Sequence, residues 1–584
     1  MARFMRFVGK EFGMRCNSCC KETEGNICET CGSSTMPDLQ CEIYWCNECK
    51  IPLIKEVNSI NKTECPLCHN EAAYLCADVR PVFPEERLLL EIILEKPLVF
   101  LQKSVWSSGN RYYIDGKSIV VTRSAYRKHS PDKIRLLLDK YAPLNNYDSF
   151  NCYIERFIKA NKLRFNKIQD EALEFIKAAA KNYSNECIVL SFSGGKDSTV
   201  TADLAVRALA DPSLVHIFGD TTLEFPMTIK YIKRFRRNNP KAIIKTAINK
   251  EKNFYDVCED IGPPARMLRW CCSMFKTGPI TRVLNNLYPD SDILTFYGIR
   301  KCESISRSKY NRIEDDAEAV KIQKQKVASP IFFWKDIDVW LYILHQGIDF
   351  NDAYRLGYER VGCWCCPNNN EKAQFLSQIY MPEQSKKWRN FLISFARRIG
   401  KPDAEEYVDS GKWKARQGGN GVAAASDIKL RFTNCTTEEN AKVYELVRPM
   451  DDAFIGLFTP FGRIAPELGR KLINEIIVVD IKTNVPILSI QPFKQDGFAY
   501  SVKIKTMNVA KHEDLQRMAG YQVRKFNACR KCLKCESLCR AGAISISDDA
   551  YTINPDKCKR CKMCVTAKYL DGGCMMAKYL RTKD

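Results

Sequence analysis

Six residues in the first half of the chain constrain its fold most strongly. Residues 193–198 read Ser-Gly-Gly-Lys-Asp-Ser and lie between the apolar run Ile188–Phe192 and the helix-like stretch Thr199–Ala210. A strand, a glycine turn and a helix in this order form a phosphate cradle, because glycines admit an anion close to the backbone and the first helical N–H groups lack intrahelical partners. An ordinary strand–turn–helix with a polar cap is the alternative interpretation.

The loop supplies several candidate ligands for a phosphate group. Lys196 adds a positive charge, and three hydroxyl groups add donors. The candidate nucleotide-binding residues are Ser193, Gly194, Gly195, Lys196, Ser198 and Thr199. Asp197 and Asp220 are candidates for Mg²⁺, although each could equally be a helix-cap or turn carboxylate.

Apolar runs alternate with helical patterns over residues 166–400. The runs are Cys187–Phe192, Leu214–Phe218, Ala242–Thr246 and Ile293–Tyr297. This alternation predicts an α/β fold with a doubly wound parallel sheet, in which ligands bind outside the carboxyl ends of the strands. The loop at 193–198 falls at that edge.

The length of 584 residues predicts roughly four domains. We expect a cysteine-rich head at 1–78, a small mixed domain at 79–165 and the catalytic domain at 166–400. Residues 401–520 are expected to form an α+β domain that begins with a linker around Gly411–Gly419. A second cysteine-rich unit is expected at 521–584. In the mixed domain, Asp115-Gly116 predicts a hairpin between Val105–Tyr113 and Lys117–Arg123. Helices are expected at Glu85–Leu94 and Asp132–Tyr141.

Composition and charge narrow the classes of partner. No stretch approaches the roughly 20 apolar residues of a membrane span, so no membrane partner is expected. The start of the chain lacks a signal-peptide pattern, which predicts a cytoplasmic protein. The 29 cysteines then indicate metal sites rather than disulfides. The net charge of +21 favours a polyanion such as nucleic acid without requiring one.

Paired cysteines in the head predict two zinc sites. Each C-x-x-C pair can place two thiolates on one tetrahedral Zn²⁺. The first site would use Cys16, Cys19, Cys28 and Cys31, and the second Cys46, Cys49, Cys65 and Cys68, with His69 as a substitute for Cys68. Such modules either bind nucleic acid or protein, or use the metal to stabilise a segment that is too small to form a hydrophobic core.

Further motifs follow the loop. They are Arg266-x-x-Arg269-Trp270-Cys271-Cys272 with Lys276, Gly298-Ile299-Arg300-Lys301-Cys302-Glu303-Ser304, Ser329-Pro330-Ile331 with Trp334 and Asp338-Val339-Trp340, and Gly362-Cys363-Trp364-Cys365-Cys366. Together with the loop, this set resembles the phosphoadenosine phosphosulfate (PAPS) reductase family of the PP-loop ATP pyrophosphatase superfamily over residues 186–370.

The resemblance implies roles for these residues. Its cluster-bearing branch would hold one [4Fe–4S] centre on Cys271, Cys272, Cys363 and Cys366, with Cys365 spare or substituting and zinc as the rival metal. Cationic contacts to phosphates or a sulfonucleotide would come from Arg266, Arg269, Lys276, Arg300 and Arg307. The implied catalytic residues are Lys196, Asp197, Asp220 and Arg300.

Two departures from the family pattern shift the expected reaction. The C-terminal Glu-Cys-Gly-Leu-His-type motif of the assimilatory reductases is missing, and the lone cysteine between Cys366 and the terminal unit is Cys435. The loop, in contrast, is complete, which fits cleavage of ATP to AMP and pyrophosphate. The sequence is therefore more similar to enzymes that adenylate an acceptor and deliver sulfur, among them the DNA-phosphorothioation enzymes and the tRNA thiolases.

The terminal unit contains two cysteine runs typical of bacterial ferredoxins. Its pattern implies one [4Fe–4S] cluster on Cys529, Cys532, Cys535 and Cys574, and another on Cys558, Cys561, Cys564 and Cys539. Arg540 replaces the usual proline, and nine residues separate Cys564 from Cys574. Zinc binding is the alternative.

Three functions are compatible with these features. The first is an Mg²⁺-dependent ATP pyrophosphatase that drives sulfur insertion into an acceptor such as DNA or tRNA, with a sulfur donor such as a cysteine desulfurase and an upstream electron donor for the ferredoxin unit. The second is a sulfonucleotide reductase that draws electrons from that unit. The third is a nucleic-acid-binding redox sensor.

Overall fold

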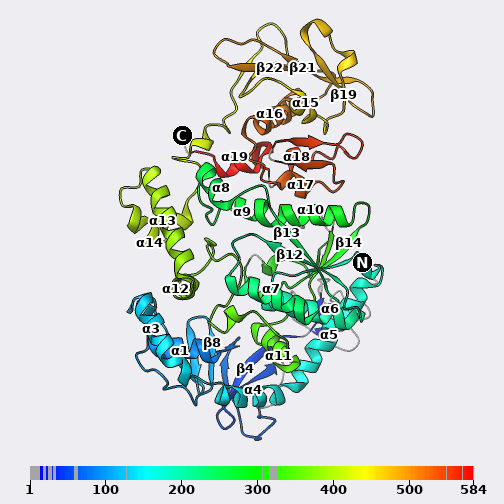
Figure 1. Cartoon of the computed structure of the whole chain (residues 1–584). Helices are drawn as coiled ribbons and strands as arrows, with labels where there is room; N and C mark the ends of the chain where they lie inside the picture. The colour runs from blue at the N-terminus through cyan, green and yellow to red at the C-terminus, as the bar shows by residue number, and fades with distance from the viewer. Residues whose placement is uncertain are drawn as a thin grey trace.

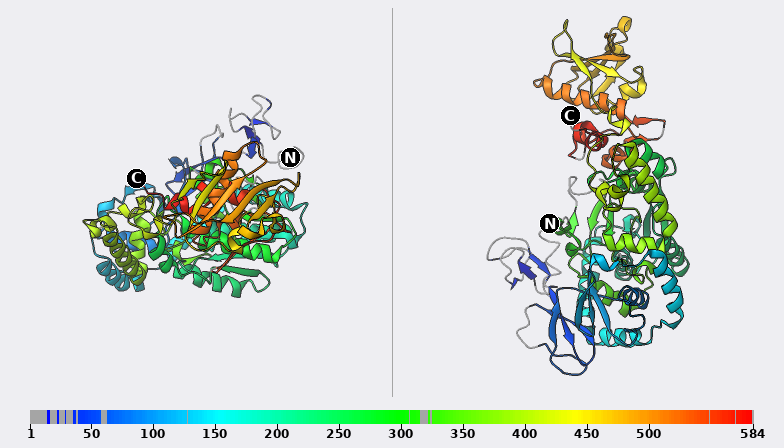
Figure 2. Two further views of the ribbon diagram at one scale, coloured as in Figure 1. Left: turned by 90° about the horizontal axis from the view of Figure 1, so that it is seen from above. Right: turned by 90° about the vertical axis from the view of Figure 1, so that its left-hand side faces the viewer.

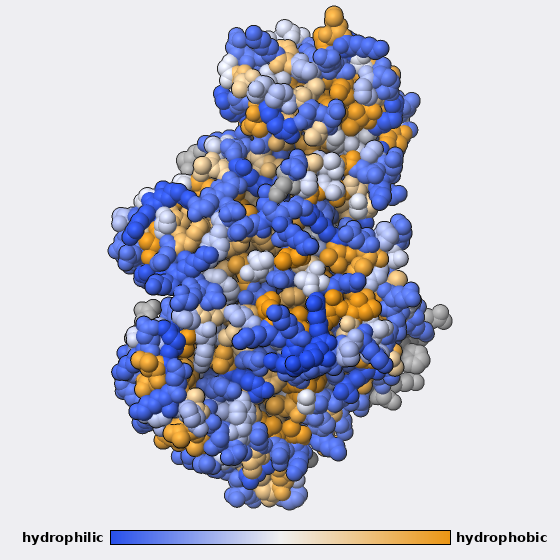
Figure 3. All heavy atoms as spheres, in the orientation of Figure 1, coloured by the Kyte–Doolittle hydropathy of each residue, from blue (hydrophilic) through white to orange (hydrophobic). Residues whose placement is uncertain are grey.

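The computed structural model describes most of the chain and shows an elongated molecule (Figures 1 and 2). The N-terminal units lie at one end, the catalytic sheet lies in the middle, and an antiparallel sheet forms the other end. On the face in Figure 3, hydrophilic side chains prevail and apolar ones lie in separate patches. The described residues are 14–16, 22–23, 29, 35–37, 39–57, 63–126, 128–305, 307–314, 322, 325–547, 549–568 and 570–582.

The central sheet has the strand order β13-β12-β11-β14-β16-β15 and is parallel except for the edge strand β15. This order confirms the predicted doubly wound sheet, because the chain steps outward from β11 first in one direction and then in the other. The strands are β11 (Ile188–Ser191), β12 (Val215–Asp220), β13 (Ile243–Ile248), β14 (Ile293–Tyr297), β15 (Ile313–Glu314) and β16 (Gln325–Ala328).

Both faces of the sheet are buried at its central strands β11 and β14, which explains why these two strands are largely apolar runs. Ile188 and Leu190 belong to one core and Val189 to another, so successive side chains of β11 point to opposite faces. Helices α5 (Lys162–Ala180), α6 (Lys196–Leu209) and α11 (Asp336–Gln346) pack together, and α10 (Gly278–Leu287) packs against β12 and β13. The same domain contains α7 (Pro226–Asn238), α8 (Phe254–Ile261), α9 (Trp270–Cys272), a π-helical turn (Ser273–Thr277), α12 (Glu371–Tyr380) and α13 (Pro382–Arg398).

Two small sheets form the N-terminal end. One has the order β5-β4-β6, from β4 (Cys41–Cys46), β5 (Ile51–Glu56) and β6 (Ala73–Cys76). The other runs from β7 (Arg80–Pro81) to β8 (Val105–Ser108), β9 (Arg111–Ile114) and β10 (Lys117–Val120). Around them lie α1 (Pro84–Ile93), α2 (Arg123–Tyr126), α3 (Pro131–Tyr141) and α4 (Asp148–Ala160). Three short strands, β1 (Met14–Cys16), β2 (Glu22–Thr23) and β3 (Thr35–Pro37), pair near the N-terminus.

The hairpin at Asp115-Gly116 is confirmed, but a single strand over Val105–Tyr113 is wrong. Asp115 and Gly116 both have positive φ (48° and 84°), as a tight two-residue turn between β9 and β10 requires. The run before it splits into β8 and β9, because Gly109 at φ 59° makes an additional turn between them.

The C-terminal third holds a six-stranded antiparallel sheet and the second cysteine-rich unit. The sheet order is β17-β18-β22-β21-β20-β19, with strands β17 (Phe432–Asn434), β18 (Ala441–Leu446), β19 (Arg463–Ala465), β20 (Ile476–Val479), β21 (Pro486–Pro492) and β22 (Tyr500–Thr506). After it come α16 (His512–Ala528), α17 (Lys534–Leu538), β23 (Ile544–Ile546), β24 (Tyr551–Ile553), α18 (Met563–Thr566) and α19 (Met575–Tyr579). Helices α14 (Ala404–Asp409) and α15 (Asp452–Gly456) precede and accompany the sheet.

The expected linker at 411–419 is packed against the rest of the molecule. Trp413 is buried, and the Gly419 N–H donates to the Arg581 carbonyl at 3.1 Å. A Cβ at Gly418 would lie 2.2 Å from the same carbonyl oxygen. The glycines here therefore permit close backbone packing rather than a flexible connection.

Candidate functional site

The glycine loop lies directly after β11, at the point where the strand order reverses. The Ser193 N–H donates to the Ser198 hydroxyl at 3.2 Å, and that hydroxyl donates to the Gly195 carbonyl at 2.8 Å. Gly194 has φ 71°, and a Cβ there would lie 3.0 Å from the methyl of Thr228 on α7. The loop is therefore a preformed turn that leads into α6 and leaves Ser193 exposed.

A buried ion network lies at the start of α6. The Lys196 ammonium is 3.2 Å from Asp197 and 3.0 Å from Asp336, and its side chain is 3% exposed. The Arg300 guanidinium pairs with Asp197 and lies 2.9 Å from Asp336. Two cations and two carboxylates thus alternate in one closed network, which is how buried charges are tolerated.

The pKa values in this network keep all four groups charged. Burial raises the pKa of Asp197, but Arg300 and Lys196 outweigh it and hold the value at about 2. Burial likewise acts to raise the pKa of Asp336, but Lys196 and Arg300 outweigh this effect and lower the pKa. The pKa of Lys196 lies above its ordinary value, because Asp197 and Asp336 outweigh the effect of burial.

Tyrosine and asparagine side chains brace the loop from the segment after α11. The Lys196 backbone N–H donates to the Tyr354 hydroxyl at 3.0 Å, and the Lys196 ammonium lies 5.3 Å from the centre of that ring. The Asn351 amide donates to the Gly194 carbonyl at 3.1 Å and to Thr228 at 2.9 Å. These contacts hold the loop at Gly194 and at the first residue of α6.

The N-terminal part of the chain contributes to the same network. Asp78 accepts hydrogen bonds from the backbone N–H groups of Asp336 (2.9 Å) and Ile337 (3.1 Å), so it caps α11 from a distant segment. Burial and the neighbouring Asp336 charge raise the pKa of Asp78 to about 7. Lys335 donates to the Ala77 carbonyl at 2.7 Å, and Arg164 pairs with Asp338 at 2.9 Å.

Asp220 stands at the end of β12, as expected, in a local turn. Its carboxylate accepts from the Thr222 N–H at 2.8 Å, which is the turn role considered for it. Glu224, four residues later, is half-buried beside the cysteines: Thr221 donates to Glu224 at 2.9 Å and lies 3.3 Å from the Cys363 sulfur. Burial raises the pKa of Glu224.

The four cysteines assigned to the catalytic domain face one another across two segments. Cys271 and Cys272 come from α9 and precede the π-helical turn, and the loop with Cys363 and Cys366 pairs with the end of the β12 segment through a Glu224–Cys363 bridge. The pKa of Cys271 is raised by Cys272 and burial and then by Cys363 and Cys366, so all four thiols lie within electrostatic reach. Cys365 instead packs into the apolar core.

These residues fit an iron–sulfur cluster better than a single zinc ion. Zn–S bonds of about 2.3 Å require tetrahedral thiolates about 3.8 Å apart. Within the described part of the chain, Cys46, Cys49, Cys65 and Cys68 are the group whose ligand atoms all lie within 4.8 Å of one another. A cubane holds each thiolate on a different iron and so suits the wider set at Cys271, Cys272, Cys363 and Cys366.

The predicted basic residues divide between the two halves of the site. Arg269 donates to the Cys272 sulfur at 3.5 Å. Burial raises the pKa of Cys363, and the positive charge of the exposed Lys276 side chain opposes this rise. Arg300 belongs to the ion network, and Arg307 pairs with Glu303 and interacts with both Arg360 and Asp197. Arg266 is exposed, and its backbone N–H donates to the Lys414 carbonyl at 2.9 Å.

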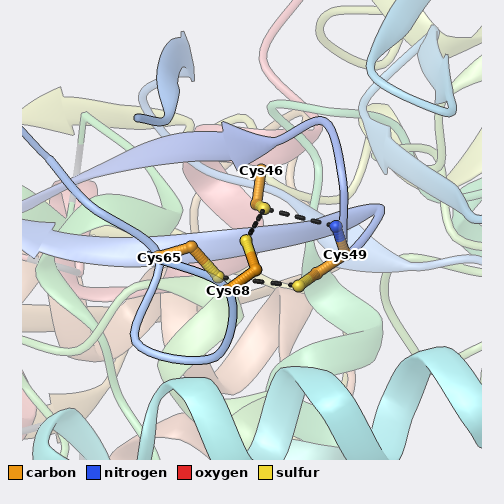
Figure 4. Close-up of side chains that lie close together, drawn as sticks. All are labelled: Cys46, Cys49, Cys65 and Cys68. Atoms are coloured by element: carbon orange, nitrogen blue, oxygen red, sulfur yellow. Dashed lines mark hydrogen bonds between the residues drawn. The ribbon is translucent and has the colours of Figure 1, made fainter. Parts of the chain in front are cut away.

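The second cysteine group of the head has the geometry of a metal site (Figure 4). Cys46 and Cys68 sulfurs are 3.4 Å apart, and those of Cys49 and Cys65 are 3.7 Å apart. Lys50 and His69, one residue after each C-x-x-C pair, both adopt positive φ and donate back to the carbonyls of Cys46 and Cys65. His69 is exposed, and Cys68 completes the group. Of the first predicted site, Cys19, Cys28 and Cys31 lie outside the described residues, and Cys16 ends β1.

Replacing Cys49 by serine is expected to remove one equivalent of zinc from the purified protein. The loss should also lower the unfolding temperature, because the β4–β6 sheet would keep its shape only through the metal. Metal analysis and a thermal melt measure the two effects. Cys76→Ser, on β6 but outside the group, should change neither, and an unaltered zinc content in Cys49→Ser would contradict the assignment.

The two terminal cysteine runs share one unusual backbone shape. Lys531 and Leu533 in the first run, and Arg560 and Lys562 in the second, all have φ between 53° and 61°, and each run then enters a short helix. Left-handed non-glycine residues are uncommon, so this repetition indicates two equivalent ligand loops. Burial, then Cys529 and Cys535, raise the pKa of Cys574 to about 12, which places Cys574 with the first run. Cys539 in turn interacts with Cys561, and Cys564 interacts with Cys535 of the first run and with Cys539 and Cys558.

Several functional candidates were not accessible from sequence motifs. Asp336, Tyr354 and Asn351 reach the loop only through the fold, and Asp78 reaches it from the N-terminal end. The one available signal was the pair of aspartates at 336 and 338. The sequence alone does not show which of the two aspartates faces the loop and which one pairs with Arg164.

The sheet order and the loop at the switch point define an α/β domain with a PP-loop-type turn. Residues 187–369 match the family model described as the phosphoadenosine phosphosulfate reductase domain. An adenosine 5′-phosphosulfate reductase of Staphylococcus epidermidis is 29% identical over 226 residues, or 38% of this chain and 84% of that protein. These matches show that residues 187–369 are similar to the PAPS reductase family.

Other similarities extend to proteins with different overall organisation. An uncharacterised protein of Methanocaldococcus jannaschii is 32% identical over 285 residues, which is 48% of this chain and 57% of that protein, so the chain spans little more than half of its length. A crystal structure of phosphoadenylyl-sulfate reductase from Candida auris aligns at 16% identity with a TM-score of 0.27, covering 35% of this chain and 95% of the other. None of the described helices has the length and apolar character needed to cross a membrane.

Proposed function

We propose that the chain cleaves ATP to AMP and pyrophosphate and uses the activated acceptor for iron–sulfur-dependent sulfur transfer. Nucleic acid is the proposed acceptor class, in keeping with the net charge of +21. Mg²⁺ would accompany the nucleotide, and a cysteine desulfurase or a similar protein would supply sulfur. The terminal cysteine-rich unit would supply electrons from two [4Fe–4S] clusters.

The observation that carries this proposal is the complete loop beside the four-cysteine group. The loop offers backbone N–H groups and the exposed Ser193 at a helix N-terminus, where a phosphate is favoured. Arg307 interacts with Asp197 in the loop and with Arg360, which in turn interacts with Cys366. An acceptor bound between these groups would meet the nucleotide on one side and the cysteines on the other.

A cluster at Cys271, Cys272, Cys363 and Cys366 would supply the electron and sulfur chemistry when bound. The residues of the chain have separate tasks. The loop orients the phosphates, and the basic side chains of Arg269 and Lys276 hold negative charge next to the thiols. The network around Lys196 keeps the start of α6 rigid, so that its N–H groups need no rearrangement to receive a phosphate.

A sulfonucleotide reductase is the second candidate, because the family model and the reductase of Staphylococcus epidermidis both match this domain. In that case an attacking thiol would be needed close to the loop. Cys435, the one cysteine between Cys366 and the terminal unit in the sequence, directly follows β17 in the antiparallel sheet, at the opposite end of the molecule from the N-terminal units (Figure 1). This placement favours the ATP-cleaving reaction.

Product analysis on anaerobically purified, cluster-loaded protein distinguishes the two candidates. We expect AMP and pyrophosphate from ATP, with a rate that nucleic acid stimulates. Sulfite release from adenylyl sulfate or its 3′-phosphate, without pyrophosphate formation from ATP, would establish the reductase instead. Lys196→Ala serves as the inactive control for either reaction.

A further inference from the structure

The terminal cysteine-rich unit packs directly on the part of the catalytic domain that carries Cys271 and Cys272. Figure 1 shows α17 and α19 next to α9 and α10, and the side view in Figure 2 shows the same neighbours. Helix α19 contacts α9, and α17 contacts both α10 and the π-helical turn. One apolar core runs through both units and includes Trp270, Met274, Leu533 and Met575.

One contact joins sequence neighbours of cysteines on both sides, and a second brings a glycine of α10 against such a neighbour in the terminal unit. Ser273, which follows Cys272, donates to the Met575 sulfur at 3.4 Å, and Met575 follows Cys574. Both side chains are buried. In addition, a Cβ at Gly278 would lie 2.5 Å from the Cβ of Leu533, which follows Cys532. The glycine therefore lets the first terminal run approach the catalytic domain closely.

Tyr579 lies between the same two cysteine groups. The pKa of its hydroxyl is raised to about 12, mainly by burial. Cys532 on one side and Cys272 and Cys271 on the other side raise it further. The ring thus belongs to the contact layer between the groups.

The two terminal groups differ in exposure. In the group nearer the catalytic domain, Cys532, Cys535 and Cys574 are buried, and Cys529 is half-buried. In the other group, Cys561 is exposed, Cys539 and Cys558 are half-buried, and Cys564 is buried. Lys525, which is 2% exposed, donates to the Cys564 carbonyl and is favoured in its charged form by Cys535, Cys564 and Cys574, so it lies between the groups.

We infer that this arrangement is an ordered electron path within one chain. The exposed group of Cys539, Cys558, Cys561 and Cys564 receives electrons from an external donor, and the buried group of Cys529, Cys532, Cys535 and Cys574 passes them across the Ser273–Met575 contact to the cysteines of the catalytic domain. The inference rests on the proposed function only in requiring iron–sulfur clusters at all three groups.

The chemistry of each step is simple. A low-potential one-electron carrier is oxidised by one electron, and the catalytic-domain group is finally reduced by one electron. No covalent bond forms or breaks and no proton moves. The positive charge of Lys525 stabilises the added negative charge on the two groups beside it, since nearby charge is one determinant of cluster potential.

The test uses full-length, cluster-loaded protein, reduced flavodoxin as the donor, and freeze-quench electron paramagnetic resonance of the catalytic-domain cluster. Flavodoxin is itself a protein and cannot reach buried thiolates. Cys561→Ser is expected to slow reduction of that cluster at least tenfold, whereas Cys152→Ser, an exposed cysteine on α4, should leave the rate unchanged. A wild-type rate in Cys561→Ser, at wild-type iron content, would overturn the path.

A second measurement needs no substitution and covers the case in which Cys561→Ser fails to assemble. In fully dithionite-reduced wild-type protein, magnetic coupling to a neighbouring cluster should broaden the resonance of the catalytic-domain cluster. An unbroadened, isolated signal would refute the junction. Neither measurement includes nucleotide or acceptor, so a protein that fails to cleave ATP but shows both results would refute the proposed reaction and leave the electron path in place.

Discussion

Replacing Asp336 by asparagine is expected to lower the free energy of unfolding by roughly 2–3 kcal/mol, somewhat below the usual cost of breaking a buried ion pair, because the Asp336 side chain is 25% exposed. The substitution leaves two buried cations, Lys196 and Arg300, with Asp197 as the carboxylate they share. Nucleotide cleavage should fall by at least tenfold, since Lys196 begins α6 at the phosphate loop. Urea denaturation and a pyrophosphate-release assay measure the two effects.

A matched control for Asp336→Asn is Asp352→Asn. Asp352 also pairs with an arginine, Arg234 at 2.8 Å, but both side chains are partly exposed, so the cost should stay below about 1 kcal/mol. A double-mutant cycle with Lys196→Met should show a coupling energy above about 1 kcal/mol, as expected for contacting charges. Additive effects in the cycle would rule out the network.

Replacing Gly298 by alanine is expected to abolish nucleotide binding. Gly298 follows β14, and a Cβ there would lie 2.5 Å from the Asp197 carbonyl carbon and 2.7 Å from the Ser198 nitrogen. Both are backbone atoms of the loop and of α6, so they cannot move aside as a flexible side chain would. Overpacking of this kind costs about 1–3 kcal/mol and would displace the phosphate-binding N–H groups. Equilibrium binding of labelled ATP provides the measurement.

Gly456→Ala provides the control for added volume alone. Gly456 ends α15, and no atom lies within 4 Å of an added Cβ. This variant should bind ATP like the wild type and change stability by less than about 0.5 kcal/mol. If Gly298→Ala retained wild-type affinity, the close approach of β14 to the loop would have no part in binding.

Much of the fold of the catalytic domain could be predicted, because the apolar runs in its sequence coincide with the buried strands of the structure. Strand β14 coincides with the predicted run Ile293–Tyr297, and α6 with the helix after the glycine turn. Strands β15 and β16 escaped prediction, since Gln325–Ala328 is short and mixes polar with apolar residues. The predicted run Val105–Tyr113 is split into two strands by a turn at Gly109. The pattern of apolar and polar residues does not reveal this turn.

Prediction of the candidate site succeeded where residues are neighbours in sequence and failed where the fold brings them together. The loop and the cysteine pairs are contiguous motifs, and the structure places each pair as a unit. Asp336 and Tyr354 join Lys196 from positions 140 and 158 residues away, a distance that no spacing rule encodes. Sequence also assigned Lys196 to the ligand directly, whereas its ammonium is held by two carboxylates.

The cap that Asp78 forms on α11 determines which fragment of this chain could keep the structure of the loop. Asp78 and Ala77 belong to the N-terminal end, yet they hold the helix that presents Asp336 to Lys196. Leu39 similarly accepts a hydrogen bond at 2.8 Å from Arg164, the arginine that pairs with Asp338. A fragment beginning at residue 166 would carry every residue of the phosphate loop but would leave α11 uncapped and Asp338 without its arginine. The part of the chain that holds the loop in this geometry therefore includes segments of residues 39–78 as well as the α/β domain.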